Sequence, residues 1–330
     1  MRSPVYDESM AALIELRGLV VELPTPGGWI RPVNEVSLRI DAGESLGLVG
    51  ESGSGKTMLS LALMGLLPPG ARVSGEATLA ARSGVKNLRM LEEREWREVR
   101  GRELAMIFQE PMTSLNPVMR IGAQVAEAIQ VHDPAAAAAQ VHRRALEALR
   151  LAAVPEAEIR AGQFPHQLSG GLRQRAMIAM ALAAGPRLLI ADEPTTALDV
   201  TVQKQILELL QKLRRELQLG LLFITHDLGV VAQVADRIAV MYAGRIIEEG
   251  PAHEVLTAPR HPYTQGLLNA SPTLERGKLT PIPGSVPQLV ALPPGCAFEP
   301  RCGLRRSECS AAVPALRAAS ADHTARCILV

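Results

Sequence analysis

Short apolar segments alternate with stretches of helical periodicity along the first half of the chain. Apolar and polar residues alternate at 36–40, which predicts a half-buried strand. A continuous apolar run at 45–49 ends in a glycine-rich turn, and helical spacing follows at 57–67. Later apolar runs predict further strands at 104–108, 188–191, 221–225 and 237–242. The alternation of strands with helices predicts an α/β fold.

Helix formers and prolines mark the remaining segments. Residues 134–151 are alanine-rich and amphipathic, and their arginine pair is interpreted as part of a solvated helix face. A turn between two strands is predicted at 242–245. Prolines crowd the chain beyond Gly250, so we expect a boundary near 251–259. The tail after it is too small and too proline-rich to build a large core of its own.

Composition and charge narrow the function classes. The 330 residues are 47% hydrophobic and 21% charged, which is typical of a globular protein with one large domain and an appendage, or with two modest domains. Lys and Arg number 35 against 34 Asp and Glu, and this balance argues against a general nucleic-acid binder. No signal peptide is expected, and no apolar run approaches the roughly 18 residues of a membrane span. We therefore expect a cytoplasmic location.

A glycine-rich octet between a predicted strand and a predicted helix fits the pattern G-x-x-x-x-G-K-[ST]. Glycines let the backbone wrap around phosphate oxygens. The lysine reaches the β- and γ-phosphates, and the hydroxyl binds Mg²⁺. A chance glycine-rich turn is the alternative, and the flanking strand and helix argue against it. The octet consists of Gly50, Glu51, Ser52, Gly53, Ser54, Gly55, Lys56 and Thr57.

Polar residues at the ends of other predicted strands are candidates for the same site. Asp192 is placed to hold Mg²⁺ through water, and Glu193 to orient or deprotonate the attacking water. An acidic pair that only aids solubility is the alternative. His226 and Gln109 also follow apolar strands. On their own they are as readily structural as functional.

The segment LSGGLRQR at 168–175 closely resembles the signature motif of ABC ATPases. In that family the signature faces the γ-phosphate of an ATP bound by the opposite subunit of a head-to-tail dimer. The residues that carry this resemblance are Leu168, Ser169, Gly170, Gly171 and Gln174. The segment Ala197-Leu198-Asp199 resembles the family's D-loop. Gln109 and His226 then match its Q-loop and switch histidine.

Longer segments resemble the ATP-binding subunits of oligopeptide, dipeptide and nickel importers. They are IFQEPMTSLNPVMRIGAQ, LSGGLRQRAMIAMAL, ITHDLGVVAQVADRIAVMYAGRIIEEG and HPYTQGLL. The resemblance implies a P-loop ABC ATPase domain at 1–255, with a mixed sheet core, an antiparallel β subdomain and a helical subdomain at about 112–180. It also implies a small cysteine-containing extension at 256–330.

The adenine platform departs from the family pattern. An aromatic residue usually stacks on the base at the end of the first strand, and that place falls on Leu23 here. Trp29 is an alternative platform, although it is also interpretable as a partly buried loop residue. With Leu23 in this place, the specificity for adenine is expected to be relaxed.

All four cysteines lie near the end of the chain, at Cys296, Cys302, Cys309 and Cys327. Their spacing lacks the C-x2-C knuckles of common zinc ribbons. Members of the resembled family carry an iron–sulfur cluster at matching cysteines, so the resemblance implies a [4Fe–4S] cluster. Zn²⁺, free thiols and disulfides remain alternatives.

The resemblance implies an ATPase motor of an importer for dipeptides and oligopeptides. It would work as a dimer with itself or a paralogous ATPase, at the cytoplasmic face of the inner membrane as a peripheral subunit. Two permeases would be its partners, and they would dock on residues 110–117 and the helices that follow. An extracytoplasmic solute-binding protein would be an indirect partner. No nucleic acid is expected as a partner. Alternatives are import of nickel or another small solute, and a non-transport ATPase in translation, DNA repair or a soluble complex.

Overall fold

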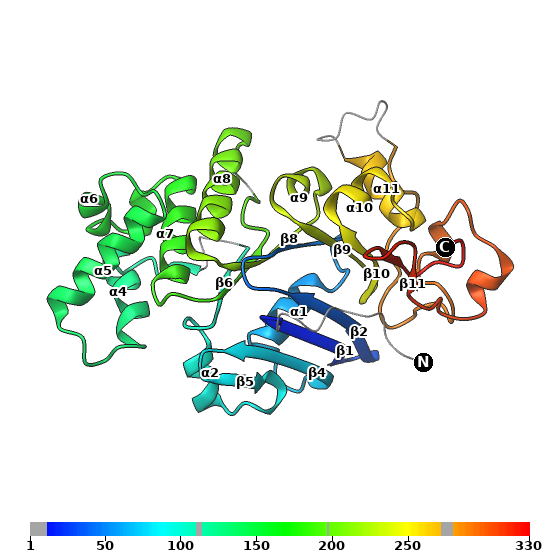
Figure 1. The fold of residues 1–330 in the computed structure, drawn as a ribbon, viewed down its shortest axis with the longest axis horizontal. Coiled ribbons are helices and arrows are strands. Elements are labelled where there is room, and N and C mark those ends of the chain that lie inside the picture. Colours follow the sequence, from blue (N-terminus) through cyan, green and yellow to red (C-terminus); the bar gives the residue numbers. More distant parts are fainter. Residues whose placement is uncertain (1–11, 110–113, 197, 272–279) are drawn as a thin grey trace. The chain divides into compact units, whose positions relative to one another are not determined.

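The computed structural model describes residues 12–109, 114–196, 198–271 and 280–330. The chain divides into two compact units (Figure 1). One unit, here called the terminal unit, combines the described residues of 12–80, 85–90, 223–271 and 280–330. The other, the middle unit, consists of 81–84 and 91–222. The beginning and the end of the chain therefore fold together.

An antiparallel sheet forms the first part of the terminal unit, drawn in blue to cyan in Figure 1. Strand order is β2-β1-β4-β5, and β1 and β2 form a hairpin in which Leu16 lies opposite Leu38. The buried side chains of β1 follow the two-residue period of a half-buried strand in two stretches, Ile14 and Leu16 and then Leu19 and Val21, with a register shift between them. The strands are β1 (Ile14–Thr25), β2 (Gly28–Ile40), β4 (Arg72–Ala81) and β5 (Gly84–Asn87), followed by the 3₁₀ turn η1 (Leu88–Met90).

A mixed sheet forms the second part of the terminal unit. Strand β3 is parallel to β9, and β9 is antiparallel to β10, so the strand order is β11-β12-β10-β9-β3. The strands are β3 (Ser45–Val49), β9 (Arg237–Tyr242), β10 (Arg245–Pro251), β11 (Arg317–Ala318) and β12 (Thr324–Ala325). The turn between β9 and β10 has positive φ at Ala243 and Gly244, and positive φ at both central residues suits a tight hairpin. The predicted turn at 242–245 is confirmed.

Helices of the terminal unit are short. They are α1 (Lys56–Leu63), α9 (Leu228–Val234), α10 (Ala252–Thr257) and α11 (Pro262–Ala270), with 3₁₀ turns η3 (Glu299–Arg301) and η4 (Ser307–Ser310) in the tail. Strand β8 (Gly220–Thr225) contributes its last residues to this unit.

The tail builds no separate core, because it packs against the mixed sheet. Strand β12 pairs with β10, which adds the end of the chain to the sheet. The rings of Tyr242 on β9, Tyr263 on α11 and Phe298 before η3 pack together, with centroids 4.5 to 5.4 Å apart. Strand, helix and tail therefore share one aromatic cluster.

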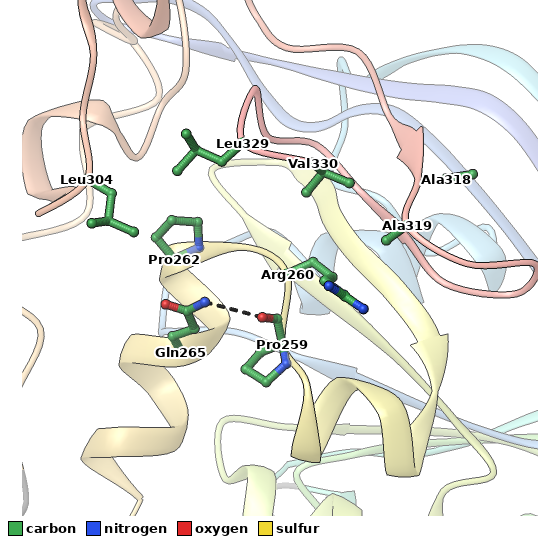
Figure 2. Close-up of a pocket in the computed structure, with 9 residues that line it drawn as sticks. All are labelled: Pro259, Arg260, Pro262, Gln265, Leu304, Ala318, Ala319, Leu329 and Val330. Atoms are coloured by element: carbon green, nitrogen blue, oxygen red, sulfur yellow. Dashed lines mark hydrogen bonds between the residues drawn. The ribbon is translucent and has the colours of Figure 1, made fainter.

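A surface pocket of about 470 Å³ lies between the start of α11 and the last residues of the chain (Figure 2). The Gln265 side chain donates a hydrogen bond to the carbonyl oxygen of Pro259 on one side of it, and Leu329 and Val330 lie on the other. The remaining lining residues are Arg260, Pro262, Leu304, Ala318 and Ala319. The end of the chain thus lies beside α11.

The middle unit pairs two parallel strands with a group of helices. Strand β6 (Leu104–Ile107) is parallel to β7 (Leu188–Asp192). Helices α4, α5 and α7 pack on one another. The helices are α2 (Glu93–Val99), α4 (Ile121–Gln130), α5 (Ala138–Leu151), α6 (Ala157–Ala161), α7 (Gly170–Leu182) and α8 (Val200–Leu217), with the 3₁₀ turn η2 (Pro165–Gln167). The helix predicted at 134–151 begins four residues later, at Ala138.

Among the described residues, no helix is both long enough and apolar enough to cross a membrane. The two sheets and the helical group correspond to the mixed sheet, the antiparallel β part and the helical part predicted from the sequence. The positions 110–113, within the predicted docking segment, and Ala197, within the predicted D-loop, lie outside the described residues.

Candidate functional site

The predicted phosphate loop connects β3 to α1 in the terminal unit. Gly53 and Gly55 have φ values of 80° and 107°, which L-residues with a side chain rarely adopt. A Cβ at Gly55 would lie 1.9 Å from the carbonyl oxygen of Pro32, and one at Gly50 would lie 2.2 Å from that of Met241. The loop therefore packs against two neighbouring strands so closely that only glycine fits at 50 and 55.

Lys56 lies at the start of α1 and is buried, with 6% of its surface exposed. Its Nζ donates hydrogen bonds to the carbonyl oxygens of Gly50 at 2.7 Å and Glu51 at 3.1 Å, and Ser54 Oγ lies 3.4 Å away. The ammonium group is thus held against the loop it follows in sequence. The next residue, Thr57, is exposed. A cation, a helix start and successive backbone N–H groups make an anion cradle.

Two residues outside the loop, which the sequence analysis missed, hold it in place. The Glu51 N–H donates a hydrogen bond to the hydroxyl of Tyr263 at 2.8 Å. The Glu51 carboxylate accepts two hydrogen bonds from the guanidinium of Arg301, at 2.7 and 3.0 Å. Tyr263 belongs to the segment HPYTQGLL, which was noted only as part of a resemblance. An acidic side chain within an anion-binding loop is the one sequence signal that a cation should be near.

The acidic pair lies at the end of β7 in the middle unit. Asp192 is the last residue of β7 and is buried. Glu193 follows with φ 47°, a left-handed conformation that is uncommon for residues other than glycine. Its Oε2 accepts a hydrogen bond from Thr196 Oγ1 at 2.8 Å and lies 3.5 Å from Gln109 Nε2. The structure therefore brings Gln109 and Glu193 together, because they follow the neighbouring parallel strands β6 and β7 at the same edge of the sheet.

His226 lies in the terminal unit, directly after β8, and it is exposed. The next residue, Asp227, caps α9 by accepting a hydrogen bond from the Gly229 N–H at 2.8 Å. His226 therefore lies at the carboxyl end of a strand, in the same unit as the phosphate loop.

The predicted signature lies at the start of α7. Ser169 is the N-cap of this helix, and its Oγ accepts a hydrogen bond from the Leu172 N–H at 3.4 Å. A Cβ at Gly171 would lie 2.7 Å from the Val202 side chain on α8, so glycine permits close packing of the two helices. Asp199 caps α8 by accepting a hydrogen bond from the Val202 N–H at 3.0 Å. Ser169 and Gly170 are exposed, whereas Leu168 and Gln174 are buried.

The two candidates for the adenine platform lie on the β1–β2 hairpin. Leu23 is half-buried and pairs with Ile30, whereas Trp29 is 44% exposed and pairs with Pro24. The guanidinium of Arg72 lies 4.0 Å from the centre of the Trp29 ring, a cation–π contact. Trp29 is thus an exposed hairpin residue with one ring face next to Arg72.

The predicted [4Fe–4S] cluster is wrong, and so is the prediction that the four cysteines bind a metal. Within the part of the chain that the structure describes, no group of three or more His, Cys, Asp or Glu residues is arranged to hold a metal ion. The four cysteines are free and line one apolar cavity of about 20 Å³, roughly the volume of a single water. Burial raises the pKa of the Cys296 and Cys302 thiols, which opposes the thiolate form that iron and zinc require. Of the alternatives left open, free thiols describe these residues.

An anion cradle of this kind between a strand and a helix is the mark of P-loop nucleotide-binding proteins. Comparison with known proteins is consistent with this class. Residues 33–196 match the ABC transporter family, and residues 247–309 match the C-terminal region of oligopeptide/dipeptide transporters.

The chain is 51% identical over 291 residues to the oligopeptide transport ATP-binding protein OppD of Bacillus subtilis, covering 87% of this chain and 80% of that protein. It is 48% identical over 315 residues to OppD of Escherichia coli, and the match covers 94% of this chain and 91% of that protein. A solved dimeric ATP-binding cassette bound to ADP and phosphate shares the fold with a TM-score of 0.63 and 29% identity, covering 72% of this chain and 98% of that chain. The chain therefore belongs to the ABC transporter family of ATP-binding proteins, and it hydrolyses ATP.

Proposed function

We propose that this chain is the ATP-hydrolysing motor of an importer for dipeptides and oligopeptides. The observation that carries the proposal is the similarity of nearly the whole chain, tail included, to oligopeptide transport ATP-binding proteins. Two permeases would provide the membrane path, and a solute-binding protein outside the membrane would deliver the peptide. The chain would attach to the permeases at the cytoplasmic face of the inner membrane.

Residues of the terminal unit would bind the nucleotide. The loop Gly50, Glu51, Ser52, Gly53, Ser54, Gly55, Lys56 and Thr57 would hold the phosphates through its N–H groups and the Lys56 ammonium. Leu23 and Trp29 would contact adenine from the exposed hairpin. His226 would donate a hydrogen bond to the γ-phosphate as charge develops on it.

Thr57, Gln109 and Asp192 would supply a hydroxyl, an amide and a carboxylate to a magnesium ion. Oxygen donors of this kind fit Mg²⁺. When bound, Mg²⁺ neutralises charge on the β- and γ-phosphate oxygens.

Glu193 would orient and polarise the attacking water. Its contact with Gln109 and its hydrogen bond from Thr196 fix the direction of the carboxylate. In the ABC arrangement the second subunit completes each site, so Leu168, Ser169, Gly170, Gly171 and Gln174 would face the ATP of the partner, and Asp199 would run along the dimer axis. The partner would be a paralogous ATPase or a second copy of this chain.

The proposal is tested by transport in a reconstituted system. The chain is assembled in vesicles with its two permeases, its partner ATPase and the solute-binding protein, and uptake of a labelled tripeptide and of ⁶³Ni²⁺ is measured with and without ATP. We expect ATP-dependent uptake of the peptide and none with Lys56→Ala. Uptake of nickel without uptake of peptide would contradict the proposal. Association of the chain with ribosomes or DNA instead of permeases would also contradict it.

A further inference from the structure

The phosphate loop carries an acidic side chain that is paired with a residue of the C-terminal tail. The guanidinium of Arg301 donates two hydrogen bonds to the Glu51 carboxylate, at 2.7 and 3.0 Å. Bidentate pairing of this kind fixes both the position and the orientation of the carboxylate. The two residues are 250 positions apart, so the pair exists only because the tail folds back onto the loop.

Arg301 is held in place independently of Glu51. Only 5% of its side chain is exposed, and its Nε donates a hydrogen bond to the carbonyl oxygen of Pro283 at 2.8 Å. A further contact of 3.3 Å joins its guanidinium to the Tyr242 hydroxyl, and the rings of Tyr242 and Phe298 lie 5.9 Å from the guanidinium carbon. These contacts preorganise the guanidinium for the carboxylate of the loop.

The backbone of the same loop residue is held by the same part of the molecule. The Glu51 N–H donates a hydrogen bond to Tyr263, whose ring is fully buried in the cluster with Tyr242 and Phe298. The side chain and the backbone of Glu51 therefore both contact residues outside the loop. Arg301 and Phe298 belong to one tail segment that the aromatic cluster fixes.

An unpaired carboxylate in this loop would repel the phosphates that the loop binds. Most of the Glu51 side chain is covered by protein, since only 30% of it is exposed, so the repulsion would be less screened than in bulk water. Arg301 neutralises the carboxylate and directs it toward the tail. We propose that Arg301 is a positioning residue for ATP binding, which acts through Glu51 and couples the C-terminal tail to the phosphate loop. The inference rests on the proposed role of residues 50–57 in ATP binding.

The test measures KM for ATP and kcat of the reconstituted complex for four variants. Arg301→Met keeps the apolar stem and removes the charge, and we expect KM to rise about tenfold with kcat changed less than about threefold. Glu51→Gln combined with Arg301→Met removes both charges and should recover most of that loss. Arg301→Lys keeps the charge but cannot pair with the carboxylate in a bidentate manner, so KM should rise less than in Arg301→Met. Arg305→Met, at an exposed tail arginine, is the matched control and should not change KM.

The double variant separates charge neutralisation from simple packing. If Arg301 only fills space, the double variant will bind ATP as weakly as Arg301→Met or more weakly, and that result would overturn the proposal. An unchanged KM in Arg301→Met would also overturn it. Thermal unfolding shows whether Arg301→Met folds. If it does not fold, Arg301→Lys becomes the test. A fall in kcat of that variant as large as the rise in its KM would contradict a positioning role.

Lys56→Ala separates this inference from the function on which it rests. Loss of binding of a fluorescent ATP analogue in that variant supports residues 50–57 as the nucleotide site. Unchanged binding would refute that site, whatever Arg301→Met does. With the site supported, the Arg301 variants test the positioning role alone.

Discussion

At the scale of single residues, Glu193 combines an uncommon backbone conformation with a fixed carboxylate. Its φ of 47° and the hydrogen bond from Thr196 direct Oε2 toward Gln109. A general base must be held within reach of the proton that it removes, and a side chain with two polar contacts has little freedom to turn away. Its geometry therefore fits the role proposed for it.

Replacing Glu193 by Gln should slow hydrolysis roughly 10²–10⁴-fold while ATP still binds, because the amide keeps the shape and loses the base. Phosphate release under saturating ATP measures the effect. Glu216→Gln, at an exposed position on α8, is the matched control and should leave the rate unchanged. Near-normal turnover in Glu193→Gln would refute the assignment.

The two loop glycines separate backbone strain from steric overlap. Gly53 and Gly55 both have positive φ, but only a Cβ at Gly55 would meet the carbonyl oxygen of Pro32. Gly53→Ala should cost about 1 kcal/mol of the free energy of unfolding, which is the cost of a left-handed conformation. Gly55→Ala should cost at least about 2 kcal/mol more, because strand and loop must also move apart. Chemical unfolding of both variants measures the difference, and equal values would contradict it.

At the scale of elements, α11 depends on a buried histidine at its start. His261 Nδ1 accepts a hydrogen bond from the Tyr263 N–H at 3.0 Å and so caps the helix. Burial lowers the pKa of His261 to about 3. The imidazole is therefore neutral at pH 7, as it must be to accept this bond.

His261 should make the protein less stable as the pH falls. In the unfolded chain His261 takes up a proton below about pH 6.5, whereas in the folded chain it does so only near pH 3. The contribution of neutral His261 to the free energy of unfolding is therefore fully present above pH 6.5 and is lost as the pH falls toward 3. The expected contribution is up to about 1.4 kcal/mol per pH unit. His261→Asn keeps an acceptor at the cap and should flatten this dependence in chemical unfolding between pH 7 and pH 5. His253→Asn, at an exposed site, should not change the slope, and an unchanged slope in His261→Asn would contradict the prediction.

At the scale of the whole molecule, Glu248 joins three segments that are distant in sequence. This residue of β10 is fully buried and accepts hydrogen bonds from the N–H groups of Arg260 and His261, at 2.6 and 2.8 Å. His323, near the end of the chain, lies 2.7 Å away through Nε2. Sheet, α11 and tail are thus held by one carboxylate.

Glu248→Gln should lower the free energy of unfolding by about 2–4 kcal/mol, because an amide nitrogen cannot accept the bonds that a carboxylate oxygen accepts. The tail should also be cut faster by proteases. Thermal unfolding and limited proteolysis with mass spectrometry measure both effects. Glu208→Gln, on the exposed face of α8, is the control, and an intact tail in Glu248→Gln would contradict this role.

Much of the fold and of the candidate site was predictable because local sequence rules determine it. The strands predicted at 45–49, 188–191 and 237–242 correspond to β3, β7 and β9, since short apolar runs bounded by turns have few alternatives. The glycine pattern at 50–57 predicted a loop between strand and helix for the same reason. The start of α5 was placed too early because residues 133–136 form a turn, closed by a hydrogen bond from the Ala136 N–H to the Asp133 carbonyl oxygen, and the helix begins only at Ala138.

The sequence by itself determined the family, the phosphate loop and the strand-end polar residues, because each depends on residues close together along the chain. Only the tertiary structure decided what the tail does. It placed Arg301 on Glu51, Tyr263 on the loop backbone and the four cysteines around one small apolar cavity. Spacing along the chain contains no distance between residues 250 positions apart, and a cluster of cysteines in sequence does not define the geometry of a metal site. Folding of the tail onto the sheet determines both.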